Sequence, residues 1–189
     1  YITAGNGAFT QEFTFSAWIF PRQTTGTVRT IFSQTTNERF IFIENGRIGV
    51  QFKDETVTPN QWPSVYGDVN LFEILPNNWY HVAVTRNLNN DINIYVNGVL
   101  TRSVLNTALN YIDNNGTNYI GSEGTNSRQF DGIIDEVIVM DRAVSANQIT
   151  AMFNDDINSY FTIHNDETNC GETWTLNSTP FDASGVEGT

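Results

Sequence analysis

Residues 130–149 read FDGIIDEVIVMDRAVSANQI, and the period of their apolar residues changes partway along the stretch. From Ile133 to Met140 the residues are rich in β-branched side chains, which is typical of a strand. From Ser145 onward the apolar residues fall at helical spacing, behind a serine that can cap a helix N-terminus. These apolar residues are Ile149, Met152 and Phe153. The stretch therefore predicts a strand that runs directly into one short helix.

Almost all of the chain before residue 143 has the pattern of short strands separated by polar turns. Asn45-Gly46 and Asn97-Gly98 each lie between two such runs, as expected for hairpins whose turns need positive φ. The predicted strands cover residues 13–20, 29–34, 39–43, 48–52, 78–86, 91–96, 99–104, 119–121 and 133–140. Because strands and helices do not alternate, we expect an all-β antiparallel sandwich and not a parallel α/β fold.

The composition narrows the classes of function. The chain has 189 residues, with 9 Lys and Arg against 21 Asp and Glu, for a formal net charge of −12. Such a surface repels nucleic-acid phosphates, so nucleic-acid binding is not expected. Excess carboxylate is compatible with calcium sites, although charge alone favours a plain soluble acidic surface. No apolar run approaches the roughly 20 residues of a membrane helix, so membrane insertion is not expected either.

Four motifs in order resemble those of the laminin-G-like, concanavalin-A-like jelly-roll family. They are FTFSAWIFP at 13–21, WYHVAVT at 79–85, IYVNG at 94–98, and IG at 120–121 followed by FDGIIDEV at 130–137 and RAVS at 142–145. The resemblance implies an antiparallel jelly-roll β-sandwich over residues 1–154, with one short helix after the last core strand. Residues 155–189 are expected to be a C-terminal extension or linker, which could add one strand.

Asp135 and Glu136 are adjacent in the last predicted strand, and strand alternation places neighbours on opposite faces. We therefore expect Asp135 to share a face with Val137, and Glu136 to share the other face with Ile138. A glycoside hydrolase needs two carboxylates across one cleft. The sequence also lacks the ladder of carboxylates on one strand that such enzymes show on this architecture. We therefore predict that the chain is not an enzyme.

The resemblance implies a calcium site, and Asp135 is the residue that we expect to bind the ion, with backbone carbonyls completing the shell. The alternative is a carboxylate held by turn amides or by an arginine such as Arg142. His81 is expected to serve packing or the surface, not catalysis, and Trp18 and Trp79 are assigned to the core.

Sugar recognition needs aromatic platforms for ring faces and polar side chains for hydroxyls. Residues of these types gather in segment 56–71, which is expected to be an irregular loop, and again before the closing strand. Such a loop often carries binding, although its aromatic side chains could equally fill a small satellite core. The predicted ligand-binding residues are Trp62, Tyr66, Tyr111, Asn114, Asn115, Asn118, Arg128 and Asp131.

The family resemblance implies binding, since its members include carbohydrate-binding modules, adhesion domains and calcium-dependent pentraxins. We expect a glycan-binding, adhesive and calcium-stabilised module of a secreted or cell-surface protein, within a larger multidomain chain. The alternative is a structural or protein-contact module of a surface fibre, adhesin or phage-like appendage that binds no sugar.

Overall fold

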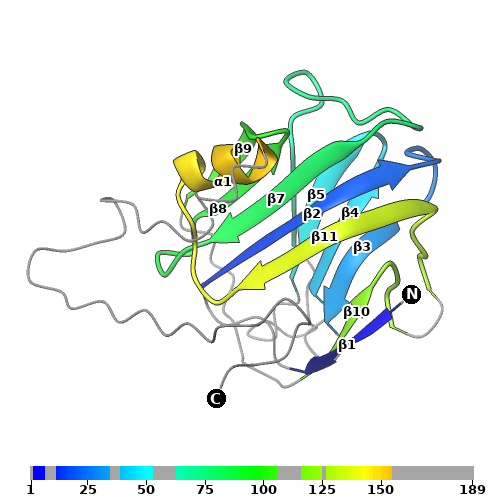
Figure 1. Ribbon diagram of the computed structural model, residues 1–189, viewed down its shortest axis with the longest axis horizontal. Helices are drawn as coiled ribbons and strands as arrows, with labels where there is room; N and C mark the ends of the chain where they lie inside the picture. The colour runs from blue at the N-terminus through cyan, green and yellow to red at the C-terminus, as the bar shows by residue number, and fades with distance from the viewer. Residues whose placement is uncertain are drawn as a thin grey trace, which may run out of the picture.

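The computed structural model of the protein describes residues 2–6, 12–34, 39–52, 63–105, 116–124 and 127–154. These residues form two antiparallel sheets (Figure 1). Within these residues the first sheet has the order β1-β10-β3-β4-β5-β6, with bounds Ile2–Asn6, Thr117–Ile120, Arg29–Gln34, Arg39–Glu44, Arg47–Gln51 and Ser64–Tyr66. The second has the order β11-β2-β7-β8-β9, with bounds Gly132–Met140, Phe13–Pro21, Tyr80–Arg86, Ile92–Val96 and Val99–Val104. The predicted all-β sandwich is confirmed.

The core fills the space between the two sheets with side chains from alternate strand positions. Phe13, Phe15 and Ile19 of β2 are at most 1% exposed. The rings of Phe15 and Phe32, on β2 and β3, lie 5.4 Å apart and so join the two layers. Burial of large side chains at every second position is the main favourable term for such a sandwich.

Both predicted Asn-Gly hairpins are confirmed by their backbone angles. Asn45 and Gly46 have φ of 49° and 72°, and Asn97 and Gly98 have φ of 50° and 75°. Two consecutive positive φ values suit the right-handed twist of the flanking strands. The other predicted strands agree with the observed ones to within two residues.

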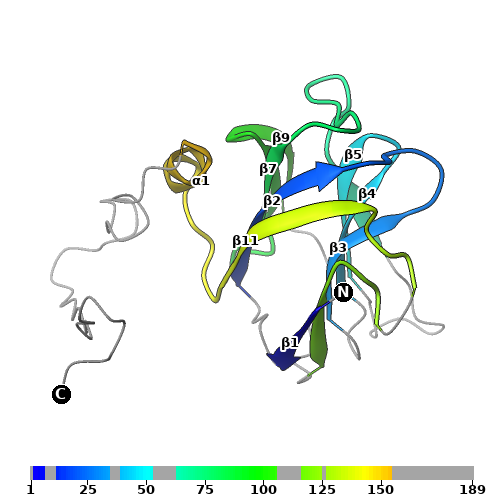
Figure 2. The same ribbon diagram turned by 45° about the vertical axis from the view of Figure 1, so that its right-hand side comes forward.

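Helix α1 (Ala146–Phe153) covers part of the outer face of the five-stranded sheet (Figure 2). Ser145 caps its N-terminus, and Gln148 completes a capping box. Ile149 and Met152 pack against outward-facing side chains of the sheet, among them Ala83 and Tyr95. The predicted helix and its cap are therefore confirmed. Among the described residues, no helix is long and apolar enough to cross a membrane.

Strand β11 contains a β-bulge that alternation alone did not predict. Asp135 pairs with Trp18, whereas Ile138 pairs with Ser16, so β11 has one residue more than β2 over this interval. Glu136 takes a positive φ of 48°, and its amide donates a hydrogen bond of 2.8 Å to Asp135 Oδ1. An extra residue of this kind leaves the ladder locally unpaired and shifts the alternation that follows it.

The bulge corrects the expected placement of the two acids. Both Asp135 and Glu136 are exposed, and they line one hollow on the outer face of the sheet. Ile134 and Val137, on either side of them, pack toward the core. Our expectation that the two carboxylates face opposite ways was therefore wrong, and it no longer argues against a carboxylate pair.

Three further expectations need correction. Trp18 and Trp79 do not belong to the core, because Trp79 is 44% exposed and Trp18 packs on the outer face against Phe153. Segment 56–71 is not wholly irregular, since Ser64–Tyr66 forms edge strand β6. Strand β1 was not predicted at all.

Candidate ligand-binding hollow between the two sheet edges

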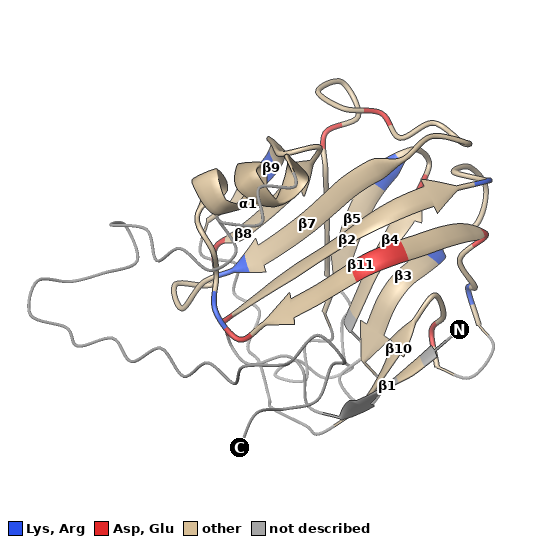
Figure 3. Cartoon of the chain, in the orientation of Figure 1, with Lys and Arg blue, Asp and Glu red and all other residues tan. Residues whose placement is uncertain are grey.

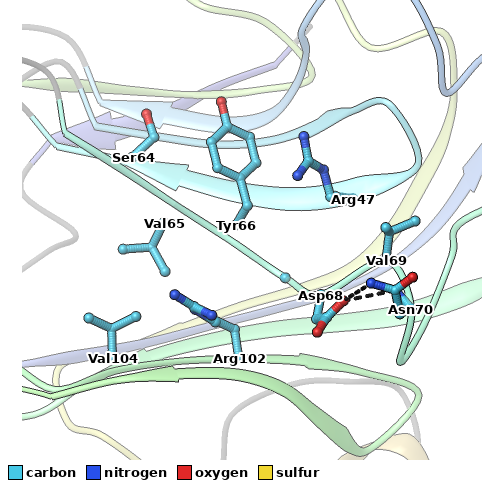
Figure 4. Close-up of a pocket in the computed structure, with 10 residues that line it drawn as sticks. Arg47, Ser64, Val65, Tyr66, Asp68, Val69, Asn70, Arg102 and Val104 are labelled. Carbon is cyan, nitrogen blue, oxygen red and sulfur yellow. Dashed lines mark hydrogen bonds between the residues drawn. The ribbon is translucent and has the colours of Figure 1, made fainter.

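A hollow of about 470 Å³ lies where β6, the edge strand of one sheet, approaches β9, the edge strand of the other (Figure 4). We call it the edge hollow. Its lining residues are Arg47, Ser64, Val65, Tyr66, Gly67, Asp68, Val69, Asn70, Arg102 and Val104. Most of them have polar side chains, and they come from both sheets and from the segment that connects them.

Gly67 allows the two sheet edges to come together. Its amide donates to Ile48 O at 2.9 Å, and the next amide, of Asp68, donates to Thr101 O at 3.2 Å. These two bonds tie one short segment to β5 on one side and to β9 on the other. A Cβ at Gly67 would lie only 2.9 Å from Thr101 Oγ1, closer than such atoms normally approach. The position therefore has no room for a side chain.

Asp68 shapes the floor of the edge hollow. Its Oδ1 accepts hydrogen bonds from the Asn70 amide at 2.9 Å and from Asn70 Nδ2 at 3.0 Å, which Figure 4 marks with dashed lines. Such a turn is a common role for aspartate. The second carboxylate oxygen, Oδ2, has no hydrogen bond within the described part of the chain, and Asp68 lines the hollow.

Tyr66, a predicted ligand-binding residue, is held in place by its neighbours. Its hydroxyl donates to Glu44 Oε2 at 2.8 Å, and the guanidinium of Arg47 lies 4.8 Å from its ring centroid. Burial, followed by the bond to Glu44, raises the pKa of the Tyr66 hydroxyl. The ring of Phe42 meets it edge-on at 5.7 Å. Tyr66 therefore supplies a fixed wall more than an open stacking platform.

Arg102 of β9 is exposed and lines the same hollow. Within the described ranges it makes neither a hydrogen bond nor an ion pair. A guanidinium presents five N–H donors in a rigid fork, which suits carboxylates and adjacent hydroxyls. Motif reasoning missed Arg102 and Asp68, because no local pattern shows that β9 lies beside β6.

The remaining described candidates do not join the edge hollow. Asn118 is 1% exposed and accepts a hydrogen bond from Gln34 Nε2 at 3.2 Å, so its side chain serves the sheet and offers no surface to a glycan. Arg128 forms an ion pair of 3.1 Å with Glu123. Asp131 lies beside the start of β11, where its carbonyl accepts from the Arg22 amide at 2.8 Å. Trp62, Tyr111, Asn114 and Asn115 lie outside the described residues.

The surroundings of Asp135 do not by themselves make a calcium shell. Calcium takes about six to eight oxygen ligands. Glu136 is the only other carboxylate that lines the hollow beside Asp135, and the described residues contain no group of three or more His, Cys, Asp or Glu placed to hold a metal. Calcium at Asp135 stays a prediction.

His81 is a packed residue of β7, as expected. It is 2% exposed, its Nε2 is hydrogen-bonded to Ser16 Oγ at 2.8 Å, and its ring lies 5.5 Å from that of Trp18. Burial lowers the pKa of His81 to about 4. The Ser16–His81 pair is closed to substrate because Ser16 too is only 1% exposed.

A laminin G-type sequence profile, described as the concanavalin A-like lectin/glucanases superfamily, matches residues 1–150. The chain belongs to this family, and the predicted resemblance is confirmed. No curated protein matches the chain in sequence.

Several solved structures are similar to this fold. The binding domain of Paraclostridial Mosquitocidal Protein 1 has 23% identity and a TM-score of 0.64 over 81% of this chain and 39% of that one. Domain 4 of the extracellular arabinanase AbnA from Geobacillus stearothermophilus, in complex with arabinotriose, has 22% identity and a TM-score of 0.62. The match covers 79% of this chain and 70% of that one. The receptor-binding domain of botulinum neurotoxin D has 20% identity and a TM-score of 0.61 over 80% and 39%.

The two toxin neighbours are described as binding domains, and each is more than twice as long as the part that the chain matches. At such identities the likeness shows the fold. Together with the family, it places the chain among lectin-like binding domains.

Proposed function

We propose that the chain is a non-catalytic glycan-binding module, adhesive in role, of an extracellular or cell-surface protein, and that the edge hollow holds the sugar. The observation that carries the proposal is that Arg102 and Asp68 Oδ2 line one open hollow of about 470 Å³ and have no hydrogen-bond partner among the described residues. The volume falls within the usual range for small-ligand sites.

The chemistry of the lining suits a sugar. Arg102 can donate to two adjacent oxygens, Asp68 can accept from a hydroxyl, and Ser64 and Asn70 can add further hydrogen bonds. Val65 and Val104 supply apolar contact for a ring face. Because Arg47 and Arg102 both line the hollow, a glycan that carries a carboxylate beside its hydroxyls fits at least as well as a neutral one.

The neighbouring structures support the proposal by analogy. One is a domain in complex with arabinotriose, and others are receptor-binding domains of toxins. The neighbours include a toxin binding domain and a domain of an extracellular enzyme, which supports an extracellular setting within a larger protein. Calcium stabilisation, with Asp135 as a ligand, is part of the same proposal and rests on the family resemblance alone.

The first experiment is a glycan array of the full chain, read with and without a chelator. We expect at least one glycan class to bind, and chelation to lower the melting temperature if calcium stabilises the fold. Absence of any bound glycan would overturn the glycan proposal. An unchanged melting temperature after chelation would overturn the calcium proposal only, so the two failures are separate.

The second experiment places the site. Arg102→Ala should weaken the array-selected glycan about tenfold or more, since a hydrogen bond to a charged group contributes about 1.5–3 kcal/mol. Arg22→Ala removes the same charge at another exposed position and is the matched control. Trp62→Ala and Tyr66→Ala should also weaken binding. Equal effects of Arg102→Ala and Arg22→Ala would show that the edge hollow is not the site.

A further inference from the structure

A second surface combines exposed aromatic rings with carboxylates. We call it the outer-face patch, and its residues are Trp18, Phe20, Trp79, Ile133, Asp135 and Glu136. Trp79 is 44% exposed and Ile133 is 46% exposed, both unusual for large apolar side chains on a sheet face. Four of the residues, Trp18, Trp79, Asp135 and Glu136, line a hollow of about 400 Å³.

The patch begins where helix α1 ends. Phe153, the last residue of the helix, packs on Trp18 with ring centroids 5.8 Å apart. Beyond this contact the row of aromatic side chains continues without the helix, with Phe20 and Trp79 at 5.5 Å. Figure 3 shows the acidic band of β11 on the broad face of the sheet, clear of α1. The helix thus covers one end of the outer face and leaves the aromatic end open.

The bulge in β11 doubles the negative charge of the patch. A regular strand would direct only one of two adjacent acids to this face, but here Asp135 and Glu136 both reach it. Asp135 Oδ1 accepts from the Glu136 amide, and neither carboxylate pairs with a basic side chain of the described residues. Among the described residues, two indoles therefore lie beside two carboxylates without a basic partner. A calcium ion at Asp135 and a basic side chain held by Asp135 and Glu136 would compete for the same carboxylate.

Charge and shape together select the ligand. A cation over an indole face is attracted by the ring, and nearby carboxylates add to that attraction. A guanidinium can also stack flat on an indole while it donates to a carboxylate. Phe20 packs on Trp79, and Ile133 pairs with Phe20, so apolar side chains lie beside the hollow. The hollow therefore suits a basic side chain that comes from an extended surface.

We propose that the outer-face patch docks a protein partner through an arginine or lysine side chain, which lies between Trp18 and Trp79 and is held by Asp135 and Glu136. Apolar residues beside that side chain in the partner pack on Ile133 and Phe20. The patch is separate from the edge hollow, which is lined by different residues.

The chain itself does not supply such a partner. Residues 155–189 contain four Asp and three Glu, thus seven acidic residues, and neither Lys nor Arg. A second copy brings its own net charge of −12 to a surface that is already acidic. Like-charge repulsion disfavours both residues 155–189 and a second copy as occupants of the patch. A basic partner would instead be attracted to it.

The test uses the full chain and two peptides, Gly-Arg-Ile-Arg-Gly and the same peptide with citrulline in place of each arginine. Citrulline keeps the size and loses the charge. Indole N–H signals in NMR titrations report the contact, and we expect the arginine peptide to shift the signals of Trp18 and Trp79 and to bind at least about fivefold tighter than the citrulline peptide.

Variants separate a specific site from a diffuse acidic surface. Glu136→Gln keeps the size of an exposed side chain and should weaken the arginine peptide about threefold or more. Glu73→Gln makes the same change at an exposed position outside the patch and should leave the affinity unchanged. Arg102→Ala should also leave it unchanged, so that failure of the glycan proposal does not affect this result.

Three outcomes would overturn the docking proposal. They are equal binding of the two peptides, equal weakening by Glu136→Gln and Glu73→Gln, and a shift of the same indole signals by an array-selected glycan but not by the peptide. The last outcome would assign the patch to sugar.

Discussion

The edge hollow and the outer-face patch are built in opposite ways. The edge hollow owes its shape to backbone hydrogen bonds around Gly67, which tie the two sheets together at one edge. The outer-face patch lies on the outer face of one sheet, and its second carboxylate comes from one inserted residue, Glu136. The edge hollow brings two arginine side chains together in an acidic protein, whereas the outer-face patch places two carboxylates beside two indole rings.

Taken together, the two proposals place two ligand chemistries on one scaffold with little change to its core. The side chains that line the edge hollow include Arg47 and Arg102, which suit oxygen-rich ligands. Those that line the patch hollow include Asp135 and Glu136, which suit cations. In neither place does a core strand have to leave its sheet. Variants that disturb one region should therefore leave ligand binding at the other region intact.

Acid should have the largest effect on stability, through His81 below the outer-face patch. Burial lowers the pKa of His81 from 6.5 to about 4, so the folded protein binds fewer protons than the unfolded chain between these values. The contribution of a neutral His81 is fully present above pH 6.5. It is lost as the pH falls from 6.5 to 4, by about 3 kcal/mol in total.

Denaturant unfolding at pH 7, 5.5 and 4 measures this loss. Other groups titrate over the same range, so His81→Gln serves as the reference that lacks the imidazole. The wild type should lose more stability than His81→Gln over this range. Parallel pH profiles for the two proteins would contradict the assignment.

Gly67→Ala should disturb the edge hollow and not the patch. The new Cβ meets Thr101 Oγ1 at 2.9 Å, and Thr101 is 3% exposed, so the segment must shift. We expect a loss of about 2 kcal/mol in urea unfolding, together with weaker glycan binding. The Gly67→Ala/Thr101→Ala double variant removes the clashing oxygen. Its loss in free energy of unfolding should therefore be smaller than the sum of the losses of the two single variants. Strict additivity would show that this contact does not limit the approach of the edges.

Ser145→Ala should destabilise helix α1, which packs on the sheet beside the outer-face patch. The Ser145 hydroxyl accepts from the Gln148 amide at 3.4 Å, and Gln148 Oε1 accepts from the Ser145 amide at 2.9 Å. Loss of the cap should cost about 1 kcal/mol in the free energy of unfolding. Ser103→Ala, at an exposed position of β9, is the control and should stay within about 0.5 kcal/mol of the wild type. Equal effects of the two variants would show that the capping box contributes nothing.

Deletion of Glu136 should have the smallest effect on the free energy of unfolding and the largest effect on ligand binding at the outer-face patch. Without this residue Asp135 can still pair with Trp18 and Ile138 with Ser16, now in a regular ladder. Removal of a non-glycine residue with positive φ offsets the lost hydrogen bond, so we expect a free energy of unfolding within about 1 kcal/mol of the wild type. Arginine-peptide binding should weaken. An unfolded deletion variant would show that the bulge is needed for the fold.

Local patterns were enough to predict the sandwich, because short-range chemistry determines its parts. The Asn-Gly turns, the alternation of Phe13 to Phe20 and the Ser145 cap all act over a few residues, and all three were found as expected. The bulge was missed because alternation assumes a regular ladder. Only the pairing of β11 with β2 shows the extra residue.

The candidate sites were harder to predict because they depend on contacts between distant segments. Tyr66 was chosen for its residue type, and it does line a hollow, but its contacts come from β4 and β5, and β9 supplies other lining residues. Asn118 was chosen in the same way and is buried by its sheet. Trp18 and Trp79 were assigned to the core because the period of a strand does not show which face the opposite sheet covers.

The most direct test of the account is one titration of the array-selected glycan against the wild type, Arg102→Ala and Glu136→Gln. We expect Arg102→Ala to weaken glycan binding about tenfold or more and Glu136→Gln to leave it unchanged. If Glu136→Gln abolishes glycan binding and Arg102→Ala has no effect, the sugar binds at the outer-face patch, and the assignment of the edge hollow is contradicted.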